Sequence, residues 1–305
     1  MSRSSDFWVI TSYFNPAKFK VKKENYCLFR ESILNQKANL LTIEQVTETS
    51  DLSGMSEVIS ISGGAILWQK ERLLNLAIKK LPSSCKFVAW LDSDILFENN
   101  NWIEESKLIL KNYQVIQPYS KVFRLPKGIQ EKKSIGESWE SFSYIYSQNS
   151  CQLLNGNFDL HGHTGFAWVT HKEVIQKLGF YDACILGSGD HMMAHAFVGD
   201  WESPCIVRIL GHSGKFLKHF QNWATRIYQK TQARVGFLPG TIFHFWHGET
   251  AHRKYVSRNK KLLEFQFDPI EDIILGKNGL WEWKSKKIEL QNYCKNYFIQ
   301  REEDS

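Results

Sequence analysis

Two aspartates, Asp92 and Asp94, follow an apolar segment and could bind a metal ion. They lie in the stretch "FVAWLDSDILFE" (residues 87–98), where five apolar residues come directly before the first carboxylate. In an extended chain, residues i and i+2 project to the same side, so both carboxylates can face one ligand. Carboxylates at the end of a buried strand need a neutralising partner, and a divalent cation carrying a diphosphate would supply it. The alternative is an ordinary turn, because Asp-Ser-Asp also favours turns and Asp can cap a helix.

Two histidines, His244 and His247, could complete such a metal site. They stand three residues apart in "HFWH", again after an apolar segment. Manganese accepts mixed carboxylate and imidazole ligands, so Asp94 together with these histidines would suit Mn²⁺ or Mg²⁺. A structural role for the two histidines is equally compatible with the spacing.

The elements that must position these side chains alternate between strand and helix. Periodicity and composition predict strands over residues 7–14, 39–46, 55–62, 86–92 and 113–119. Helices are predicted over 30–37, 68–82 and 101–112. This alternation favours an α/β fold with a mostly parallel sheet flanked by helices, in which ligands bind at the carboxyl ends of strands. The two aspartates would lie at one of those ends.

The second half of the chain is predicted to supply the remaining candidates from loops and strand ends. We expect a glycine-rich loop, a short strand and a helix over 161–182, and a second glycine-rich loop entering a helix over 187–200. A strand over 240–249 would end in the two histidines, and an amphipathic helix would cover 288–298.

The composition is that of a globular protein with a mild basic excess. The 305 residues are 43% hydrophobic and carry a net charge of +6, which permits an anionic partner without selecting one. The six cysteines are scattered without a CxxC pair, which argues against a zinc ribbon or redox motif and fits reduced thiols in a cytoplasmic protein. We see no signal peptide and no segment apolar enough to span a bilayer, so the expected location is the cytoplasm.

Three blocks occur in the order "WQKERLLNLAIKKL…KFVAWLDSDILF", "GHTGFAWVTHKEVIQKLGFYDACILGSGDHMMAHA" and "FHFWHGE". The first resembles the Arg/Lys-x-Leu-Leu-Asn helix and Asp-x-Asp strand of the GT-A glycosyltransferases, in particular their β-1,4-galactosyltransferase-like branch (family 2/7-like). The second is similar to that branch's glycine-rich acceptor loop, helix and Gly-Gly-Glu-Asp segment. The third resembles its Met-x-x-His segment. The order of the blocks, across residues 7–255, carries the resemblance.

The resemblance implies a GT-A (Rossmann-like) fold and a metal-dependent glycosyltransferase. Such an enzyme would move a hexose or pentose from a nucleoside diphosphate sugar, by expectation a UDP-sugar, to a hydroxyl with inversion. By position, Asp94 would bind the metal and His247 would match the family histidine, whereas His244 stands where the branch has methionine. Imidazole is a better Mn²⁺ ligand than a thioether, so this departure is chemically sensible. The donor would be contacted by Thr11, Ser12, Arg72, Asp92 and Asp94.

A second departure concerns the catalytic base. In "GSGDH", Asp190 and His191 stand where the branch has its acidic pair. Either side chain could accept the proton of an acceptor hydroxyl, and we favour Asp190. The alternative is that Asp190 caps the following helix. The acceptor would be contacted by His163, Gly165 and Trp168, although core packing suits Trp168 as well.

The resemblance also implies a domain organisation and leaves the acceptor open. A catalytic domain would span residues 1–255, with a nucleotide-sugar-binding half (1–120) and an acceptor and catalytic half (121–255), and residues 256–305 would form a helical extension packed on it. A glycan or glycolipid acceptor is expected. A hydroxylated base in DNA is the alternative, because segments 253–261 and 284–287 are basic. A non-catalytic nucleotide-sugar-binding protein on the same fold is another. A nucleotidyltransferase would leave "GSGDH" and "HFWH" without a role.

Overall fold

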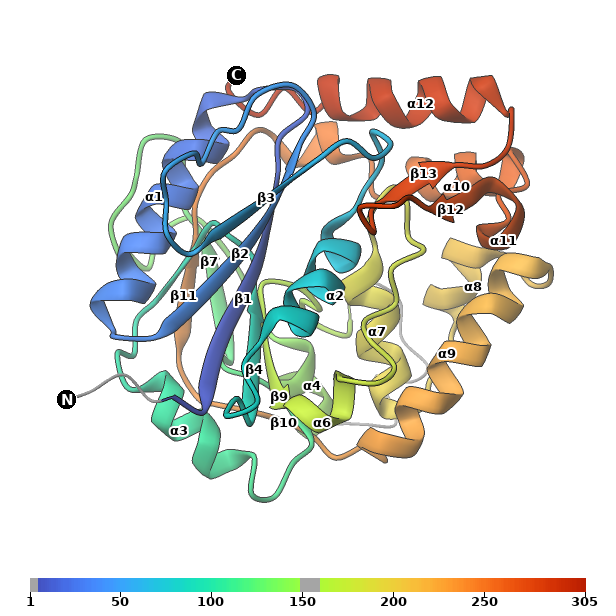
Figure 1. The fold of residues 1–305 in the computed structure, drawn as a ribbon. Coiled ribbons are helices and arrows are strands. Elements are labelled where there is room, and N and C mark those ends of the chain that lie inside the picture. Colours follow the sequence, from blue (N-terminus) through green and yellow to red (C-terminus); the bar gives the residue numbers. More distant parts are fainter. Residues whose placement is uncertain (1–4, 149–159) are drawn as a thin grey trace.

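The computed structural model describes residues 5–148 and 160–305 and has a central seven-stranded sheet covered by helices on both faces (Figure 1). The central sheet contains β1 (Phe7–Phe14), β2 (Asn39–Val46), β3 (Val58–Ser62), β4 (Phe87–Leu91), β6 (Val115–Gln117), β9 (Ala167–His171) and β10 (Val235–Phe237). The second sheet contains β5 (Ile95–Phe97), β7 (Lys121–Arg124), β8 (Glu137–Glu140) and β11 (Thr241–His244), and a small third sheet pairs β12 (Ile273–Leu275) with β13 (Trp281–Trp283).

The helices fall mostly between the strands in the first half of the chain and cluster together in the second half. Those of the first half are α1 (Lys20–Asn35), α2 (Lys70–Lys80), α3 (Trp102–Ile109) and α4 (Phe142–Gln148). Those of the second half are α6 (Lys172–Ile175), α7 (Gly189–Val198), α8 (Pro204–Leu210), α9 (Lys215–Thr231), the 3₁₀ helix η1 (Thr250–Arg253), α10 (Ser257–Glu264), α11 (Pro269–Asp272) and α12 (Ile288–Ile299).

The central sheet runs in the order β10-β6-β9-β4-β1-β2-β3, and only β9 is antiparallel to its neighbours. The predicted mixed, mostly parallel sheet flanked by helices is therefore confirmed. The boundaries of β1 and β2 agree with the prediction. The helix predicted over 30–37 begins earlier, at Lys20, because Asn25 and Tyr26 are buried together with Phe29 and Ile33. The charged residues at the start of this helix hid its apolar face in the sequence.

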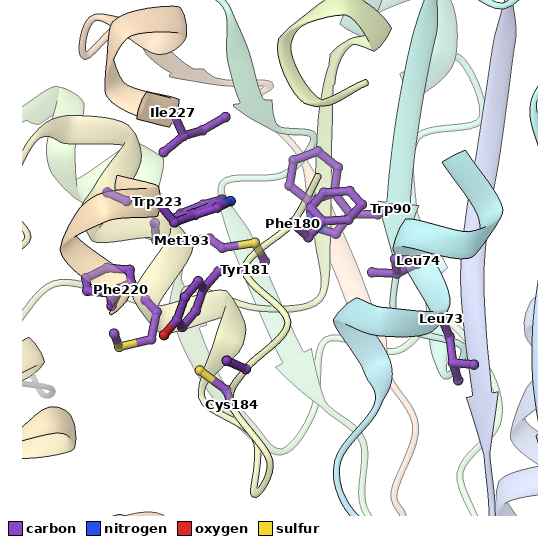
Figure 2. Packing of buried hydrophobic residues seen from close by; sticks show 14 of the residues in the cluster. Leu73, Leu74, Trp90, Phe180, Tyr181, Cys184, Met193, Phe220, Trp223 and Ile227 are labelled. Atoms are coloured by element: carbon purple, nitrogen blue, oxygen red, sulfur yellow. The ribbon is translucent and has the colours of Figure 1, made fainter. Parts of the chain in front are cut away.

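Alternate residues of the central strands pack into two different cores. In β4, Val88 and Trp90 enter the core beneath α2, α7 and α9, while Ala89 and Leu91 enter the core on the opposite face. A strand covered on both faces needs this near-continuous apolar sequence. Figure 2 shows Trp90 near Leu74 of α2, with Met193 of α7 lying toward the aromatic residues of α9. This packing holds α7, whose first turn carries Asp190, in place beside the sheet.

The second sheet brings Asp94 and His244 close together. Strand β5 begins at Ile95, directly after Asp94, and pairs antiparallel with β11 so that Ile95 lies opposite His244. The amide N–H of Phe245 donates to the Asp94 carbonyl over 2.9 Å. The pairing of His244 with Ile95, which is 149 positions earlier in the sequence, thus sets His244 beside Asp94.

The last residues return across the molecule to the beginning of α1 (Figure 1). The Asp304 carboxylate accepts hydrogen bonds from the amides of Lys20 and Val21 over 3.0 and 2.8 Å, and the rings of Phe298 and Phe14 meet edge to face at 4.9 Å. In the described ranges, no helix is long and apolar enough to cross a membrane. Cys151, one of the scattered cysteines, lies outside the described residues, and the division at residue 255 stays a prediction.

Candidate functional site

A pocket of about 620 Å³ opens at the carboxyl ends of β1 and β4, the edge predicted for ligand binding. Its walls come from the segment after β1, the β4–β5 connection, the loop before β9, the start of α7 and the segment after β11. The residues singled out from the sequence that line it are Ser12, Asp92, Asp94, His163, Gly165, Asp190, His191, His244 and His247.

Three predicted metal ligands converge at the bottom of this pocket. His247 Nε2 lies 3.1 Å from Asp94 Oδ2, His244 Nε2 lies 3.6 Å from Asp94 Oδ1, and the two Nε2 atoms are 3.1 Å apart. Both histidines are buried. Burial lowers the pKa of His244 to about 3 despite the nearby Asp94 carboxylate, so its imidazole is neutral, as metal binding requires.

The spacing of these atoms fits a divalent cation. Two ligands at right angles, each about 2.1 Å from a metal ion, are about 3 Å apart, close to the separations between these three side chains. Asp94 Oδ1 and His244 Nδ1 are buried with no hydrogen-bond partner among the described residues. One carboxylate and two imidazoles are a donor set that Mn²⁺ accepts.

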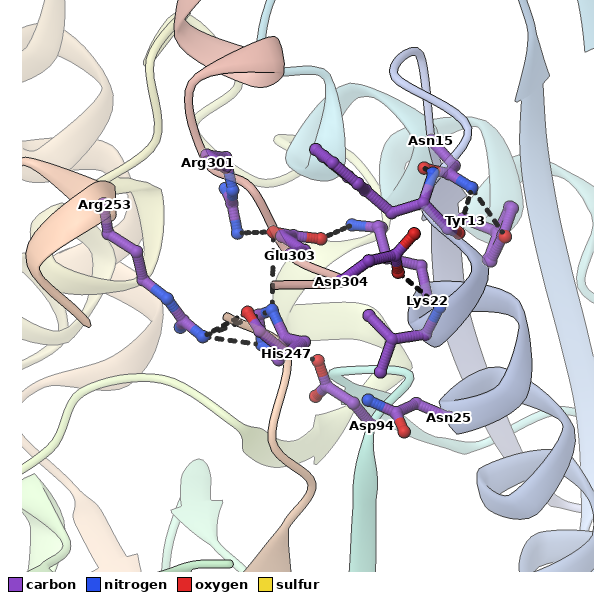
Figure 3. Close-up of polar contacts among 12 residues, drawn as sticks. Tyr13, Asn15, Lys22, Asn25, Asp94, His247, Arg253, Arg301, Glu303 and Asp304 are labelled. Atoms are coloured by element: carbon purple, nitrogen blue, oxygen red, sulfur yellow. Dashed lines mark hydrogen bonds and ion pairs between the residues drawn. The ribbon is translucent and has the colours of Figure 1, made fainter. Parts of the chain in front are cut away.

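Glu303 supports His247 from the other end of the chain (Figure 3). Its Oε1 lies 3.4 Å from His247 Nδ1, and it also pairs with Arg301 and Lys22. Although burial opposes it, Lys22 and Arg301 hold the pKa of Glu303 well below its usual range. A carboxylate on the second nitrogen of a metal-binding imidazole orients the ring and raises its basicity. In the sequence, Glu303 is one residue of the acidic stretch "REEDS", which reads as a solvated tail.

Guanidinium groups surround the candidate metal centre. Arg253 contacts the His247 ring through NH2, 3.0 Å from Nε2, and Arg124 and Arg258 line the same pocket. Arg253 and Arg258 are only 8% and 4% exposed. Buried guanidinium groups beside carboxylates and imidazoles suit an anionic ligand such as a diphosphate. Part of the basic segment over 253–261 thus faces the pocket instead of solvent.

Lys70, which the sequence analysis did not identify, links Asp92, a predicted donor contact, to Asp190, the candidate base. Its Nζ forms ion pairs with Asp92 and, over 2.6 Å, with Asp190. Burial opposes the charge on Lys70, but Asp190 and Asp92 raise its pKa above the usual range. Burial raises the pKa of Asp92 to about 6, with Lys70 opposing and Asp190 adding to the shift. The signal in the sequence is the position of Lys70 in the first turn of the helix that precedes the Asp-x-Asp strand.

Two residues predicted to contact the donor do not line the pocket. Arg72, two residues after Lys70, turns away from the pocket and pairs with Asp182 over 3.0 Å. Thr11 is fully buried and donates its hydroxyl hydrogen to the Leu91 carbonyl over 2.7 Å, inside the sheet. Both side chains are therefore engaged in the packing of the fold.

Trp168, which was predicted to contact the acceptor, lies in the core. The indole is 1% exposed, stacks on Trp90 with ring centroids 6.1 Å apart, and donates to the Thr164 carbonyl. An indole covered on both faces offers no surface to a sugar. Core packing, the alternative considered for this residue, is what the structure has.

The remaining candidates lie at or near the N-terminal turn of α7. Ser188 is the N-cap residue of α7, so Asp190 does not cap the helix and its carboxylate turns to Lys70. His191 lies against His195 and His161. Burial is the main cause that lowers the pKa of His191 well below its usual range, and the two neighbouring imidazoles lower it further. Gly165 is close to Asp190, because a Cβ there would lie 3.4 Å from Asp190 Oδ2.

No protein-family model matches the chain, and no curated protein matches its sequence. Similar solved structures include TarS (residues 1–349) of S. aureus, at 10% identity over 97% of this chain and 71% of that chain, with a TM-score of 0.37. A mutant of Drosophila β1,4-galactosyltransferase 7 in complex with manganese, UDP-Gal and xylobiose matches at 10% identity over 95% and 98%, with a TM-score of 0.40. A glycosyltransferase involved in the glycosylation of the major capsid of PBCV-1 matches at 12% identity over 84% and 99%, with a TM-score of 0.34. Values this low carry no inference about activity, so the function must be argued from the side chains of this chain.

Proposed function

We propose that this chain is a metal-dependent GT-A glycosyltransferase that transfers a sugar from a nucleoside diphosphate sugar to an acceptor hydroxyl. The observation that carries the proposal is the meeting of Asp94, His244 and His247 in one pocket with Asp190 and several guanidinium groups. This combination supplies metal ligands, positive charge for a diphosphate and a carboxylate able to accept a proton. The GT-A resemblance of the three sequence blocks agrees with it.

Each of these groups has a defined role in the proposed reaction. Asp94, His244 and His247 would hold Mn²⁺ or Mg²⁺, which when bound offsets negative charge on the leaving diphosphate. Arg253 and Arg124 would bind the phosphate oxygens, and Ser12 would lie near the nucleotide. Asp92 would accept a hydrogen bond from a donor hydroxyl.

Asp190 would act as the base in an inverting displacement. Lys70 Nζ lies 2.6 Å from Asp190 Oδ2, so this contact would orient the carboxylate and leave Oδ1 for the acceptor proton. We prefer Asp190 to His191, because His191 faces His195 and His161.

A glycan or glycolipid hydroxyl is the acceptor that we propose. His163 and Gly165 would contact it from the loop before β9. A base in DNA is less favoured, because Arg253 and Arg258 of the basic segment are buried beside the pocket and Lys287 pairs with Asp272. We retain the predicted catalytic domain (1–255) and C-terminal extension (256–305) as part of this proposal, with Glu303 as the extension's contribution to the metal centre.

Titration of donor nucleotide by calorimetry tests the metal centre. Asp94→Ala and His247→Ala should abolish the Mn²⁺-dependent part of UDP binding, because each removes a ligand. His212→Ala, at an exposed histidine, is the matched control and should bind as the unaltered protein does. Undiminished Mn²⁺-dependent binding in Asp94→Ala would refute the metal assignment.

Donor turnover separates an enzyme from a non-catalytic binding protein. With a panel of UDP-sugars, the unaltered protein should release UDP by transfer or slow hydrolysis. Asp190→Asn should keep Mn²⁺-dependent UDP binding while turnover falls by about 10²- to 10⁴-fold, the usual contribution of a general base. Binding without turnover of any donor, with or without candidate glycans, would instead favour the non-catalytic alternative.

A further inference from the structure

A second group of potential metal ligands lies behind the wall of the pocket. Three histidines and a cysteine, His161, His191, His195 and Cys205, each offer one ligand atom within 4.8 Å of the others. All four side chains are buried, with exposures between 0% and 7%. None of them belongs to the Asp94 centre, and the proposed reaction uses none of them as a metal ligand.

Three separate segments supply these side chains. His191 and His195 stand at i and i+4 on one face of α7, where neighbouring turns bring side chains together. Cys205 lies in the first turn of α8, and His161 lies in the loop before β9. The imidazole centroids of His161, His191 and His195 are 4.7 to 5.2 Å apart, so the three rings surround one point.

Hydrogen bonds on the outer side of the cluster orient two of the rings. His195 Nδ1 lies 2.8 Å from Asp200 Oδ2, and His161 Nδ1 lies 2.8 Å from the Gly162 carbonyl oxygen. An Nδ1–H that donates to a carboxylate or carbonyl leaves the lone pair on Nε2, the usual arrangement of a metal-binding histidine. His195 Nε2 is fully buried and has no hydrogen-bond partner among the described residues.

We propose that His161, His191, His195 and Cys205 bind a structural zinc ion. Zinc takes nitrogen and thiolate ligands in a tetrahedron, at about 2.0–2.1 Å and 2.3 Å, which sets ligand atoms about 3.3–3.6 Å apart. The four atoms lie within 4.8 Å of one another. Side-chain rotations that move the ligand atoms by about one ångström would therefore bring them to the tetrahedral separations. Four protein ligands leave no open position, which is typical of structural and not catalytic zinc. Hard cations such as Mg²⁺ prefer oxygen ligands and do not suit this set.

Such an ion would tie the acceptor side of the pocket to the helices behind it. His161 and His191 also line the pocket. His191 directly follows Asp190, and His161 lies in the same loop as His163 and Gly165. One zinc ion would therefore fix α7, α8 and this loop relative to one another. The proposal does not depend on the glycosyltransferase function, because the ion would act on folding whatever the pocket binds.

Metal content measured in a protein without the first centre tests the proposal. Asp94→Ala/His247→Ala protein, purified without chelator and desalted, should retain about one equivalent of zinc per chain by mass spectrometry of the metal. Adding Cys205→Ser or His195→Ala should remove it, whereas adding Cys27→Ser or His212→Ala should not. Treatment with a strong zinc chelator should lower the melting temperature of the Asp94→Ala/His247→Ala protein, and zinc should restore it.

Cobalt substitution gives a second readout that does not require the ligand variants to fold well. Only the second group contains sulfur, so Co²⁺ there should give a near-ultraviolet thiolate-to-cobalt band and the visible spectrum of a tetrahedral ion. The band should persist in Asp94→Ala and vanish in Cys205→Ser. Two results would overturn the proposal. One is a folded Asp94→Ala/His247→Ala protein that retains no zinc after desalting, and the other is a Co²⁺ complex without the thiolate band.

Discussion

At the scale of single residues, the candidate active site depends on buried or half-buried carboxylates that are paired with histidine, lysine or arginine side chains. Asp94 is buried, yet His244 and His247 hold its pKa well below its usual range. Lys70 forms ion pairs with both Asp92 and Asp190. Glu303 stands behind His247 between Arg301 and Lys22. Since a buried charge is costly without a partner, each removal should have a measurable effect.

Replacing Glu303 by Gln should weaken metal binding. The amide keeps the volume of the side chain but loses the charge that orients His247 through Nδ1, and such outer-shell changes cost about 10- to 100-fold in metal affinity. Calorimetric titration with Mn²⁺ would measure the change. Glu302→Gln, at the adjacent exposed carboxylate, is the matched control. Equal Mn²⁺ affinities for the two variants would contradict a role for Glu303.

Replacing Lys70 by Met should shift the pH dependence of turnover. Burial raises the pKa of Asp92, Lys70 lowers it and the Asp190 charge raises it, so the pKa of Asp92 should rise further without the cation. The acid limb of the kcat/KM profile should then move to higher pH and the maximal rate should fall. Lys79→Met, at an exposed lysine of the same helix, should leave the profile in place. An unshifted acid limb in the Lys70 variant would count against the Lys70–carboxylate link.

At the scale of elements, two sheets and a returning tail assemble the site. The β4–β5 connection carries Asp92 and Asp94 from one sheet into the next, and the pairing of β5 with β11 adds His244. The tail after α12 adds Glu303 through a close approach to the loop after β11. Gly248 makes this approach possible, because a Cβ there would lie 2.9 Å from the Glu303 Cα.

Gly248→Ala should therefore displace the tail and lower Mn²⁺ affinity toward that of Glu303→Gln. Gly248 has φ of +80°, so alanine also introduces backbone strain of about 1–2 kcal/mol. Gly128→Ala separates the two effects, because Gly128 has nearly the same φ, +81°, and a Cβ there meets no described atom within 4 Å. Both variants should melt at lower temperature, but only Gly248→Ala should lose Mn²⁺ affinity. Unchanged affinity in Gly248→Ala would contradict the proposed role of this contact.

At the scale of the whole molecule, the core contains a buried carboxyl group, that of Glu71, close to the charge of Asp190 in the pocket. Glu71 lies on α2 between the sheet and α7, 1% exposed, with its Oε1 lacking a hydrogen-bond partner among the described residues. Burial, and then the Asp190 charge, raises the pKa of Glu71 to about 8. Its carboxyl also fills the space beside Gly189, where a Cβ would lie 2.2 Å from Oε1. The helix that carries the catalytic candidates therefore packs on a carboxyl group whose surroundings favour its protonated form.

The stability of the protein should fall as pH rises through this range. The folded state holds the Glu71 proton more tightly than the unfolded chain, whose ordinary value is 4.5. The stabilisation is thus fully present below about 4.5 and lost as pH rises to about 8. Glu71→Gln should flatten this part of a melting-temperature profile, whereas the exposed Glu104→Gln should follow the unaltered protein. Parallel profiles for the Glu71 variant and the unaltered protein would disprove the assignment.

Local patterns in the sequence were sufficient to predict the type of fold and to single out the side chains of the candidate metal centre. Apolar runs of strand length alternating with helical periodicity predict a mostly parallel sheet, because these patterns reflect burial on two faces or on one. The same reasoning locates Asp92, Asp94, His244 and His247 at strand ends, where ligands bind in such folds. That β11 lies in the second sheet and pairs with β5 was not predicted. Asp190 follows from its position at the start of a helix after two glycines.

Tertiary structure alone decided which of the neighbouring residues reach the pocket. Lys70 and Arg72 stand two positions apart on one helix, and the packing of α2 against the sheet turns the first toward Asp92 and the second toward Asp182. Trp168 lies in the core because β9 runs between β4 and β6. Glu303, and the group formed by His161, His191, His195 and Cys205, depend on contacts between segments far apart in the chain. Spacing along the sequence records local periodicity, but a site formed by the docking of distant segments leaves no periodic pattern, because its members are brought together only when the core closes.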